Sequence, residues 1–388
     1  MKKILLISNY YSAYISAGTS QRTRDIKKGL SKLGWSCKLV TIKRRNFPIS
    51  REPDKEDIIG IPTLSERYPI PFSRIIKLYK LIKGTNIVHI IDHWSILNIL
   101  IVYFCRVSKT PYVFSPCGAL KPIGRNVFLK EIYNFIFLKS ILRHASYIFA
   151  VTENELNEIN MIQNKKDKVI ILPNGVWVKS KITYKDKDKD KDKDKDKMKK
   201  SNIKDFKLPS NYILFVGRLS YIKGPDILAD AFLKMKIRKN YFLIFAGPDD
   251  NMKNKITKLI KNSIDEKKII FLGKIYQEER DFLMKNASLV VIPSRKEAMS
   301  LVALESSILG TPFLATKNCG LDYFEKNKSG FICLGNSASI AMKLDLILKD
   351  KKNLKRVGQN AKNLIIDNYN WEIILKKMNF YLFNSIKK

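Results

Sequence analysis

Two cations in the segment VGRLSYIKG, Arg218 and Lys223, are the residues of this chain best suited to bind an anionic ligand. They stand where an apolar strand pattern runs into a glycine-containing turn. In open α/β sheets, ligands bind outside the carboxyl ends of the strands, where Arg, Lys and helix N-termini hold phosphates. Two cations at such a strand end favour a pyrophosphate, although a single motif of this kind is also typical of an ordinary exposed turn.

Two glutamates, Glu297 and Glu305, follow the apolar run LVVI and the turn PSRK. A helix is expected from near Ser300 to Gly310, which places Glu297 in the preceding loop and Glu305 inside the helix. The backbone amides of 299–301 would then face a ligand. Carboxylates accept charge-assisted hydrogen bonds from sugar and ribose hydroxyls, whereas isolated glutamates are more often solvated.

These residues are expected to be positioned by short buried strands that alternate with helical patterns. Six apolar runs precede Pro173 and six more follow residue 208. The runs lie at 4–8, 37–42, 87–91, 112–115, 147–151, 169–172, 213–216, 242–246, 269–272, 289–292, 312–315 and 331–334. Alternating strands and helices predict two doubly wound, Rossmann-like α/β domains in tandem.

A low-complexity run of alternating Lys and Asp, Lys185–Lys197, separates the two sets of strands. We interpret 1–178 as the first domain, 179–208 as a solvated linker and 209–370 as the second domain. A helix over 371–388 has one apolar face and is expected to pack back on the first domain. The Asp residues of the run are not assigned to a metal site, because a metal needs carboxylates held by a folded neighbourhood.

Composition narrows the functional classes. Lys and Arg number 72 against 36 Asp and Glu, a formal net charge of +36, which fits anionic partners or reflects biased codon usage. The five cysteines form no CxxC pair, so neither a disulfide framework nor a zinc site is indicated. No secretory signal or membrane-spanning run is apparent, and we expect a cytoplasmic protein.

Taken in order, VGRLxxxKG, AGPDD at 246–250, PSRxE, the glutamate pair, GTP at 310–312 and GL at 320–321 resemble the family-four retaining glycosyltransferases. The resemblance implies a GT-B fold, with two Rossmann-like domains facing a central cleft. It also implies that Arg218 and Lys223 neutralise the donor diphosphate, that Glu297 contacts the transferred sugar and that Glu305 holds the ribose. Ser300 and Leu301 are the expected helix-end contacts to the nucleotide sugar.

The first half is similar to the same family at IVHIIDHWS, SPCGAL, TENELNEI and PNGV, and the pattern fits bacterial members that build surface polysaccharides. Gly18 follows the first strand, where members carry glycines that let the backbone approach phosphates. This chain differs from the family pattern at two places in the expected site. Met299 and Ser300 replace a common Phe-Gly, and Cys117 stands where relatives place a basic or imidazole group. Arg22, His93 and Cys117 are candidate contacts to donor or acceptor.

The resemblance implies retaining transfer from a nucleotide-diphosphate sugar to a glycan or lipid-linked glycan, with no cofactor and no metal. Since no paired acid and base suggests double displacement, we expect transfer on one face of the sugar, with the leaving diphosphate taking the acceptor proton. Asn126–Arg143 interleaves apolar and basic residues, typical of a helix lying on an anionic membrane or of a buried helix with snorkelling lysines. We therefore expect cytoplasmic location with peripheral attachment to the inner face of the plasma membrane.

Three other functions fit part of the pattern. A nucleotide-sugar epimerase of the same fold would bind the donor without transfer, but the PSRxE motif and the glutamate spacing favour a transferase. A nucleic-acid-binding protein is suggested by charge alone, and no binding motif supports it. A degenerate transferase kept as a scaffold is compatible with Ser300 and Cys117, although Arg218, Lys223, Glu297 and Glu305 are all present.

Overall fold

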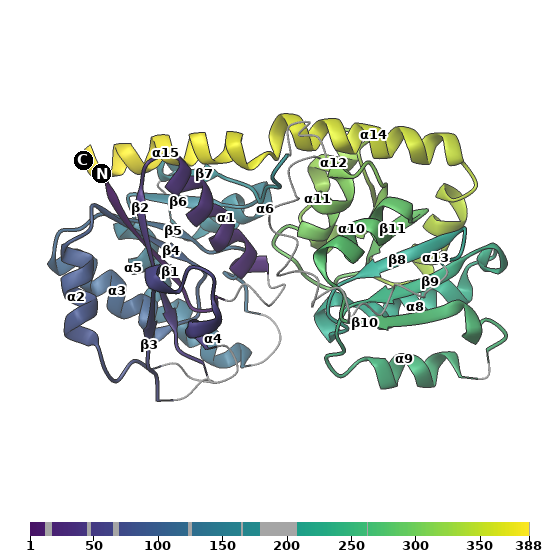
Figure 1. Ribbon diagram of the computed structural model, residues 1–388, viewed down its shortest axis with the longest axis horizontal. Helices are drawn as coiled ribbons and strands as arrows, with labels where there is room; N and C mark the ends of the chain where they lie inside the picture. Colours follow the sequence, from purple (N-terminus) through teal and green to yellow (C-terminus); the bar gives the residue numbers. More distant parts are fainter. Residues whose placement is uncertain are drawn as a thin grey trace, which may run out of the picture. The chain divides into compact units, whose positions relative to one another are not determined.

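The computed structural model describes residues 1–11, 18–44, 48–64, 70–122, 126–163, 166–178, 208–261 and 263–387. The chain divides into two compact units, here called unit 1 (Met1–Gly175 with Trp371–Lys388) and unit 2 (Val176–Asn370). Each unit has one parallel sheet flanked by helices, which confirms the predicted α/β class with two doubly wound domains (Figure 1). The Lys/Asp run lies outside the described residues.

Unit 1 has a seven-stranded parallel sheet in the order β3-β2-β1-β4-β5-β6-β7. The strand order reverses between β1 and β4, which pair directly. The strands are β1 Lys3–Ser8, β2 Ser36–Ile42, β3 Ile58–Ile61, β4 Ile87–Ile91, β5 Tyr112–Ser115, β6 Tyr147–Ala150 and β7 Val169–Ile171. The sequence pattern missed β3, because four residues that include Gly60 carry too little strand signal to be distinguished from a loop.

The helices of unit 1 lie over both faces of this sheet. They are α1 Gly18–Lys32, α2 Ile75–Lys83, α3 Ile96–Val107, α4 Val127–Tyr133, α5 Lys139–His144, α6 Glu153–Ile162 and α15 Trp371–Lys387. A π-helical turn, Asn134–Leu138, joins α4 to α5. Over one face, Leu78 of α2, Ile101 of α3 and Ile141 of α5 form one apolar cluster with Leu5 and Ile7 of β1.

The C-terminal helix α15 returns to unit 1 and packs beside α1, as Figure 1 shows along the upper side of this unit. Trp371 at its start is completely buried, and Asn379 accepts a 2.7 Å hydrogen bond from the Trp35 indole. Tyr381 meets the ring of Tyr147 edge to face. The apolar positions of the helical pattern, among them Ile374, therefore form the buried side of α15.

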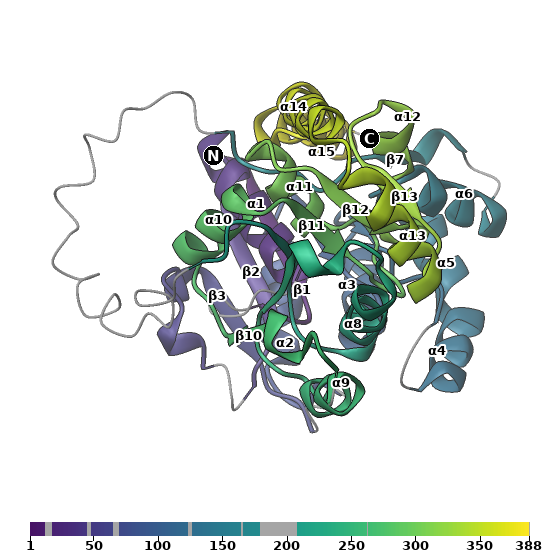
Figure 2. The ribbon, with the colours of Figure 1, turned by 90° about the vertical axis from the view of Figure 1, so that its right-hand side faces the viewer.

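Unit 2 has a six-stranded parallel sheet in the order β10-β9-β8-β11-β12-β13, with its reversal between β8 and β11. The strands are β8 Tyr212–Val216, β9 Phe242–Ala246, β10 Ile269–Gly273, β11 Leu289–Ile292, β12 Phe313–Thr316 and β13 Phe331–Cys333. The helices are α8 Pro225–Lys234, α9 Lys253–Ile260, α10 Gln277–Asn286, α11 Leu301–Ile308, α12 Asp322–Lys326, α13 Ser337–Ile347 and α14 Lys351–Asn368. Figure 2 gives a second view of these strands and helices.

The strands of unit 2 are nearly continuous apolar runs because both of their faces are covered. Phe215 and Phe245 join Leu228, Phe232 and Leu344 in one core under α8 and α13. Within the described part of the chain, no helix is long and apolar enough to cross a membrane. The strands of this core include β8 and β11, whose carboxyl ends lead into the loops of the site.

Candidate functional site

The reversal of strand order in unit 2 places two loops side by side. The loop after β8 carries Arg218 and Lys223, and the loop after β11 carries Glu297. Because β8 and β11 are neighbours and parallel, both loops leave the same edge of the sheet at the point where the helices diverge to opposite faces. This is the position at which open α/β sheets bind their ligands.

Two backbone approaches set the shape of the loop after β8. A Cβ on Gly247 would lie 1.9 Å from the Gly217 carbonyl oxygen, and Leu219 N donates to the Pro248 carbonyl at 2.9 Å. Gly224 has a φ of 66°, and a Cβ there would lie 2.2 Å from the Pro293 carbonyl oxygen. Only glycine combines that left-handed backbone with so close an approach, so Gly224 sets the spacing between the two loops.

The structure brings Lys223 and Glu297 together and leaves Arg218 nearer solvent. Lys223 Nζ lies 2.9 Å from Glu297 Oε1, with side chains 30% and 10% exposed. The Ser294 hydroxyl donates a further hydrogen bond to the same oxygen. Arg218 forms an ion pair with Asp250 at 3.0 Å in which both side chains are largely exposed. Such an exposed pair has a small net energy, so a phosphate can replace Asp250 as the partner of Arg218 at little cost.

Arg295 joins the two loops, and the sequence reasoning assigned it no role. Its guanidinium binds both carboxylate oxygens of Asp226 at 2.9 Å, and its Nη1 also donates to the Tyr221 carbonyl. Burial alone would raise the pKa of Asp226, but hydrogen bonds from Arg295 and Lys255 hold it below its usual value. The bidentate pair clamps the segment that carries Lys223 against the loop that carries Glu297.

The start of α11 differs in one respect from the expected geometry. The Ser300 amide was expected to face the ligand, but it donates to the Cys319 carbonyl at 3.2 Å, and the Glu297 amide donates to Asn318 at 2.8 Å. Both amides therefore tie the loop to the segment after β12. The Ser300 hydroxyl is buried and has no hydrogen-bond partner among the described residues. Leu301 begins α11, as the sequence indicated to within one residue.

Glu305 lies in the second turn of α11 and pairs with a residue that the sequence did not single out. Its Oε1 lies 3.1 Å from Nη2 of Arg280, which belongs to α10. Both side chains are about one-fifth exposed, at 20% for Glu305 and 21% for Arg280. Arg280, on the neighbouring helix, thus holds the carboxylate of Glu305, the residue expected to contact the ribose.

In unit 1, Gly18 begins α1, and the loop just before it, 12–17, lies outside the described residues. Arg22 in the next turn is only 2% exposed. Its guanidinium donates to the carbonyls of Leu172 and Pro173 and to Asn174 Oδ1, each at 2.9 Å. Arg22 therefore anchors the PNG segment to α1 inside the unit, while its contact with donor or acceptor stays a prediction.

His93 and Cys117 follow β4 and β5 at the same edge of their sheet. Burial lowers the pKa of His93 to about 4, and its Nε2 lies 2.9 Å from Asn134 Oδ1, so the imidazole is neutral at neutral pH. Burial raises the pKa of Cys117 to about 12, which keeps it a thiol. Neither residue offers a charge to a ligand, and their predicted contacts to donor or acceptor remain predictions.

Asp92, beside His93, holds the first residues after β1. It accepts hydrogen bonds from the backbone amide of Asn9 at 2.8 Å and from the Asn9 side chain. Burial raises the pKa of Asp92 to about 7, against the opposing effect of these hydrogen bonds. Asp92 thus positions the chain where it leaves β1 at the reversal point of unit 1.

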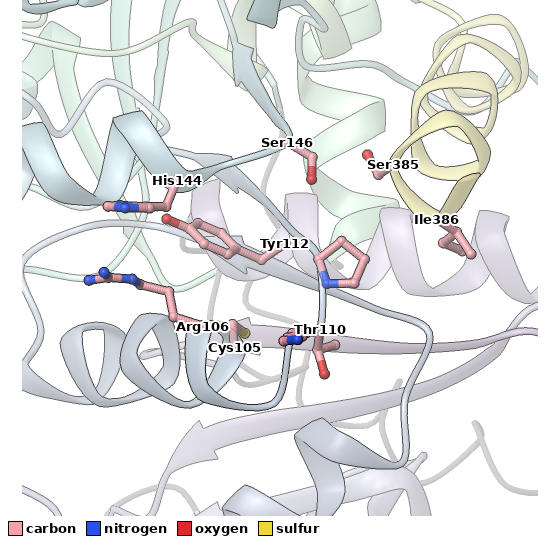
Figure 3. A pocket seen from close by; sticks show the side chains of 10 residues that line it. Cys105, Arg106, Thr110, Tyr112, His144, Ser146, Ser385 and Ile386 are labelled. Atoms are coloured by element: carbon pink, nitrogen blue, oxygen red, sulfur yellow. The ribbon is translucent and has the colours of Figure 1, made fainter. Parts of the chain in front are cut away.

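A cavity of about 320 Å³ lies at the amino ends of β5 and β6 in the unit 1 sheet, opposite to the carboxyl ends of the strands (Figure 3). Arg106 and His144 line it, together with Ser146 and Ser385. Arg106 occupies the last turn of α3, where its positive charge complements the negative end of the helix dipole, and His144 occupies the last turn of α5. Because the cavity lies away from the carboxyl ends of the strands, we do not assign the site to it.

Among the described residues, no cluster of three or more His, Cys, Asp or Glu side chains is placed to hold a metal ion. The site of unit 2 consists instead of cations, carboxylates and backbone groups around the ends of β8 and β11. Such a set can neutralise a diphosphate and accept hydrogen bonds from hydroxyls.

Comparison with known proteins agrees with this arrangement. Residues 196–364 match the family model of Glycosyl transferases group 1, and residues 16–179 match that of Glycosyltransferase Family 4. An uncharacterized glycosyltransferase of Methanocaldococcus jannaschii is 26% identical over 97% of this chain and 96% of its own length. A lipopolysaccharide 1,2-N-acetylglucosaminetransferase of Salmonella typhimurium is 27% identical over 45% of this chain and 49% of its own.

Among solved structures, HepE of Anabaena in complex with UDP superposes with a TM-score of 0.72 at 16% identity, covering 99% of this chain and all of its own. At that identity the likeness concerns the fold. The match to Glycosyltransferase Family 4 covers most of unit 1, and the match to Glycosyl transferases group 1 covers most of unit 2. The chain therefore belongs to the group 1 glycosyltransferases of the GT-B fold.

Proposed function

We propose that this glycosyltransferase moves a hexose or related sugar from a nucleotide-diphosphate sugar to a glycan acceptor, with retention of configuration and without a metal. One observation carries the proposal: Lys223 and Glu297 lie 2.9 Å apart at the reversal point of unit 2, on the edge of the sheet that also carries Arg218. The cations suit a diphosphate, and the carboxylate suits a sugar hydroxyl.

In the proposed reaction, the bond from the sugar C1 to the diphosphate oxygen breaks, and the acceptor hydroxyl oxygen bonds to C1 on the same face. The hydroxyl proton passes to an oxygen of the departing diphosphate. Arg218 and Lys223 stabilise the negative charge that grows on this leaving group. Glu297 orients Lys223 and accepts from a hydroxyl of the transferred sugar.

A role in surface-polysaccharide or lipopolysaccharide synthesis is supported by the Salmonella relative, and use of a uridine nucleotide by the UDP complex of HepE. An acceptor carried on lipid would require the enzyme to work at a membrane surface. The alternatives, an inactive scaffold or an epimerase, are distinguished by supplying a donor together with an acceptor, because only a transferase then forms a new glycosidic bond.

Donor binding should be independent of metal and should depend on Glu305. In calorimetry with UDP-, GDP- and ADP-sugars in EDTA, we expect one donor class to bind, and Glu305→Ala to weaken it about 10- to 100-fold, as expected for a charge-assisted hydrogen bond. Glu325→Ala, an exposed acid on α12, is the matched control. Absence of binding by any donor would refute the transferase proposal, and binding only with added divalent metal would refute its metal independence.

Membrane attachment is proposed through the segment formed by α4, the π-helical turn and α5. Phe128 is 72% exposed and Phe135 is 91% exposed, although both are large apolar side chains. Lys130, Lys139 and Arg143 belong to the same segment. Exposed aromatic side chains interleaved with cations suit the interface of an anionic bilayer, where the rings enter the headgroup region and the cations meet lipid phosphates.

Replacing both rings, in Phe128→Ser with Phe135→Ser, should weaken binding to phosphatidylglycerol vesicles at least about tenfold, because two apolar side chains no longer enter the interface. Co-sedimentation measures the effect, and vesicles of phosphatidylcholine should bind little of either protein. Phe282→Ser, which changes a 53% exposed ring of α10 in unit 2, is the control. Equal sedimentation of the double variant and the parent would show that this segment is not the attachment site.

A further inference from the structure

Arg44 lies where the chain leaves β2, at the carboxyl edge of the unit 1 sheet. Because β1 and β2 are parallel neighbours, Tyr10, which follows the end of β1, leaves the sheet at the same edge. The Arg44 guanidinium lies over the Tyr10 ring, 5.0 Å from its centroid, within the range of a cation–π contact. The two loops therefore join a cation and an aromatic ring at the edge where open α/β sheets bind ligands.

Hydrogen bonds from the sheet fix the backbone beside both residues. The Lys43 amide donates to the Ile61 carbonyl of β3 at 2.9 Å, which extends the pairing of β2 with β3 to the residue before Arg44. The hydroxyl of Ser8, the last residue of β1, donates to the Tyr10 carbonyl at 3.0 Å. The sheet thus sets the positions from which the two side chains meet.

The charge of Arg44 is not neutralised by the protein. Among the described residues, its guanidinium forms no hydrogen bond or ion pair, and the side chain is partly exposed. Asp54 and Asp57, which follow in the connection to β3, both contact Lys27 of α1 instead, at 2.6 and 2.9 Å. Lys43, beside Arg44, is exposed and adds a second positive charge.

Stacking on a ring prepares an arginine to bind an oxyanion. The ring contacts the face of the guanidinium, whereas the N–H groups that bind a phosphate or carboxylate lie along its edge. Because the ring restricts the orientation of the guanidinium, less conformational freedom is lost when an anion binds. The planar fork can then donate two parallel hydrogen bonds to one oxyanion.

We propose that Arg44, supported by the ring of Tyr10, is a specificity residue that binds an anionic group of the acceptor glycan, a phosphate or a carboxylate. This inference rests on the proposed function, in which the donor binds at the corresponding edge of unit 2 and the edge of unit 1 is left for the acceptor. An acceptor that carries the oxyanion is favoured over a neutral one of similar shape, because only the charged acceptor engages the fork.

The test uses glucose 6-phosphate, glucuronate and methyl α-glucoside as probes. Saturation-transfer NMR measures their binding to the full chain saturated with the nucleoside diphosphate that it binds, so that the site of unit 2 is occupied. We expect the parent protein to bind the two anionic probes at least about fivefold more tightly than the neutral glucoside. Arg44→Gln should bring this ratio close to one, and Arg44→Lys should give an intermediate ratio because lysine lacks the planar fork.

Variants of Tyr10 test the support of the guanidinium. Tyr10→Phe keeps the ring and should keep the parental ratio, whereas Tyr10→Leu should lower the ratio about threefold because the cation–π contact is lost. Arg106→Gln is the matched control, since Arg106 is an exposed arginine of the same unit at the amino ends of the strands. Thermal melting shows whether each variant folds, and Arg44→Lys decides if Arg44→Gln does not.

A parental ratio in folded Arg44 variants overturns the inference alone, as does an equal loss in Arg106→Gln, which would indicate a general effect of charge. Co-sedimentation with phosphatidylglycerol vesicles separates the glycan from a lipid headgroup. Arg44→Gln should sediment like the parent protein, and loss of vesicle binding with an unchanged ratio would overturn the inference. Failure of the parent protein to bind UDP, GDP or ADP would overturn the proposed function and the inference with it.

Discussion

Replacing Lys223 with methionine should lower kcat for sugar transfer about 100- to 1000-fold, the usual effect of removing one group that stabilises developing charge. Methionine keeps an unbranched side chain of nearly the same length and removes the ammonium group. In the parent protein that group lies 2.9 Å from Glu297 Oε1 and belongs to the loop that leaves β8. The effect should fall mainly on kcat, because negative charge on the diphosphate increases as the bond to the sugar breaks.

The measurement is single-turnover transfer together with donor affinity, so that chemistry and binding are separated. Lys234→Met is the control, because Lys234 pairs with Asp230 at 2.6 Å on the exposed side of α8 and has no part in the site. If Lys223→Met weakened donor binding 1000-fold and left the single-turnover rate unchanged, Lys223 would be a binding residue without a role in stabilising the leaving group.

Replacing Gly224 with alanine should destabilise unit 2 by about 3 kcal/mol and lower transfer at least about tenfold. Two effects combine. Alanine at a φ of 66° costs about 1–2 kcal/mol, and its Cβ would lie 2.2 Å from the Pro293 carbonyl oxygen, so the two site loops must move apart. That movement separates Lys223 from Glu297 and weakens the clamp between Arg295 and Asp226.

Gly310→Ala separates the two effects, because Gly310 has a φ of 78° and nothing lies within 4 Å of its added Cβ. Only the backbone cost of about 1–2 kcal/mol should appear there, with transfer close to the parent value. Urea unfolding and initial rates of transfer provide the comparison. Equal effects of the two alanines on activity would show that the approach of Gly224 to Pro293 does not position the site.

The chain's local pattern predicted most of the strands, because burial on both faces of a parallel sheet leaves a continuous apolar run in the sequence. It missed β3, whose four residues include Gly60. The pattern likewise predicted the positions of Arg218, Lys223, Glu297 and Glu305 relative to strand and helix ends. These are local properties, set by residues within one or two turns of each other.

The partners of these residues could not be predicted in the same way. Arg295 meets Asp226 across 69 positions of the chain, and Arg22 meets Pro173 across 151. Arg22 is predicted to contact donor or acceptor, and this stays a prediction, but its three protein acceptors could not be predicted from the sequence. The Ser300 amide likewise found a partner in Cys319, which the order of strands brings beside it.

The sequence by itself therefore determined the family, the class of fold and the charged residues at the ends of β8 and β11, because motif order and apolar periodicity are properties of neighbours along the chain. Only the tertiary structure decided which charge meets which. It paired Lys223 with Glu297, Arg295 with Asp226 and Arg280 with Glu305. The physical reason is that hydrogen bonds act over about 3 Å, and distances on that scale between distant segments are set by how strands and helices pack.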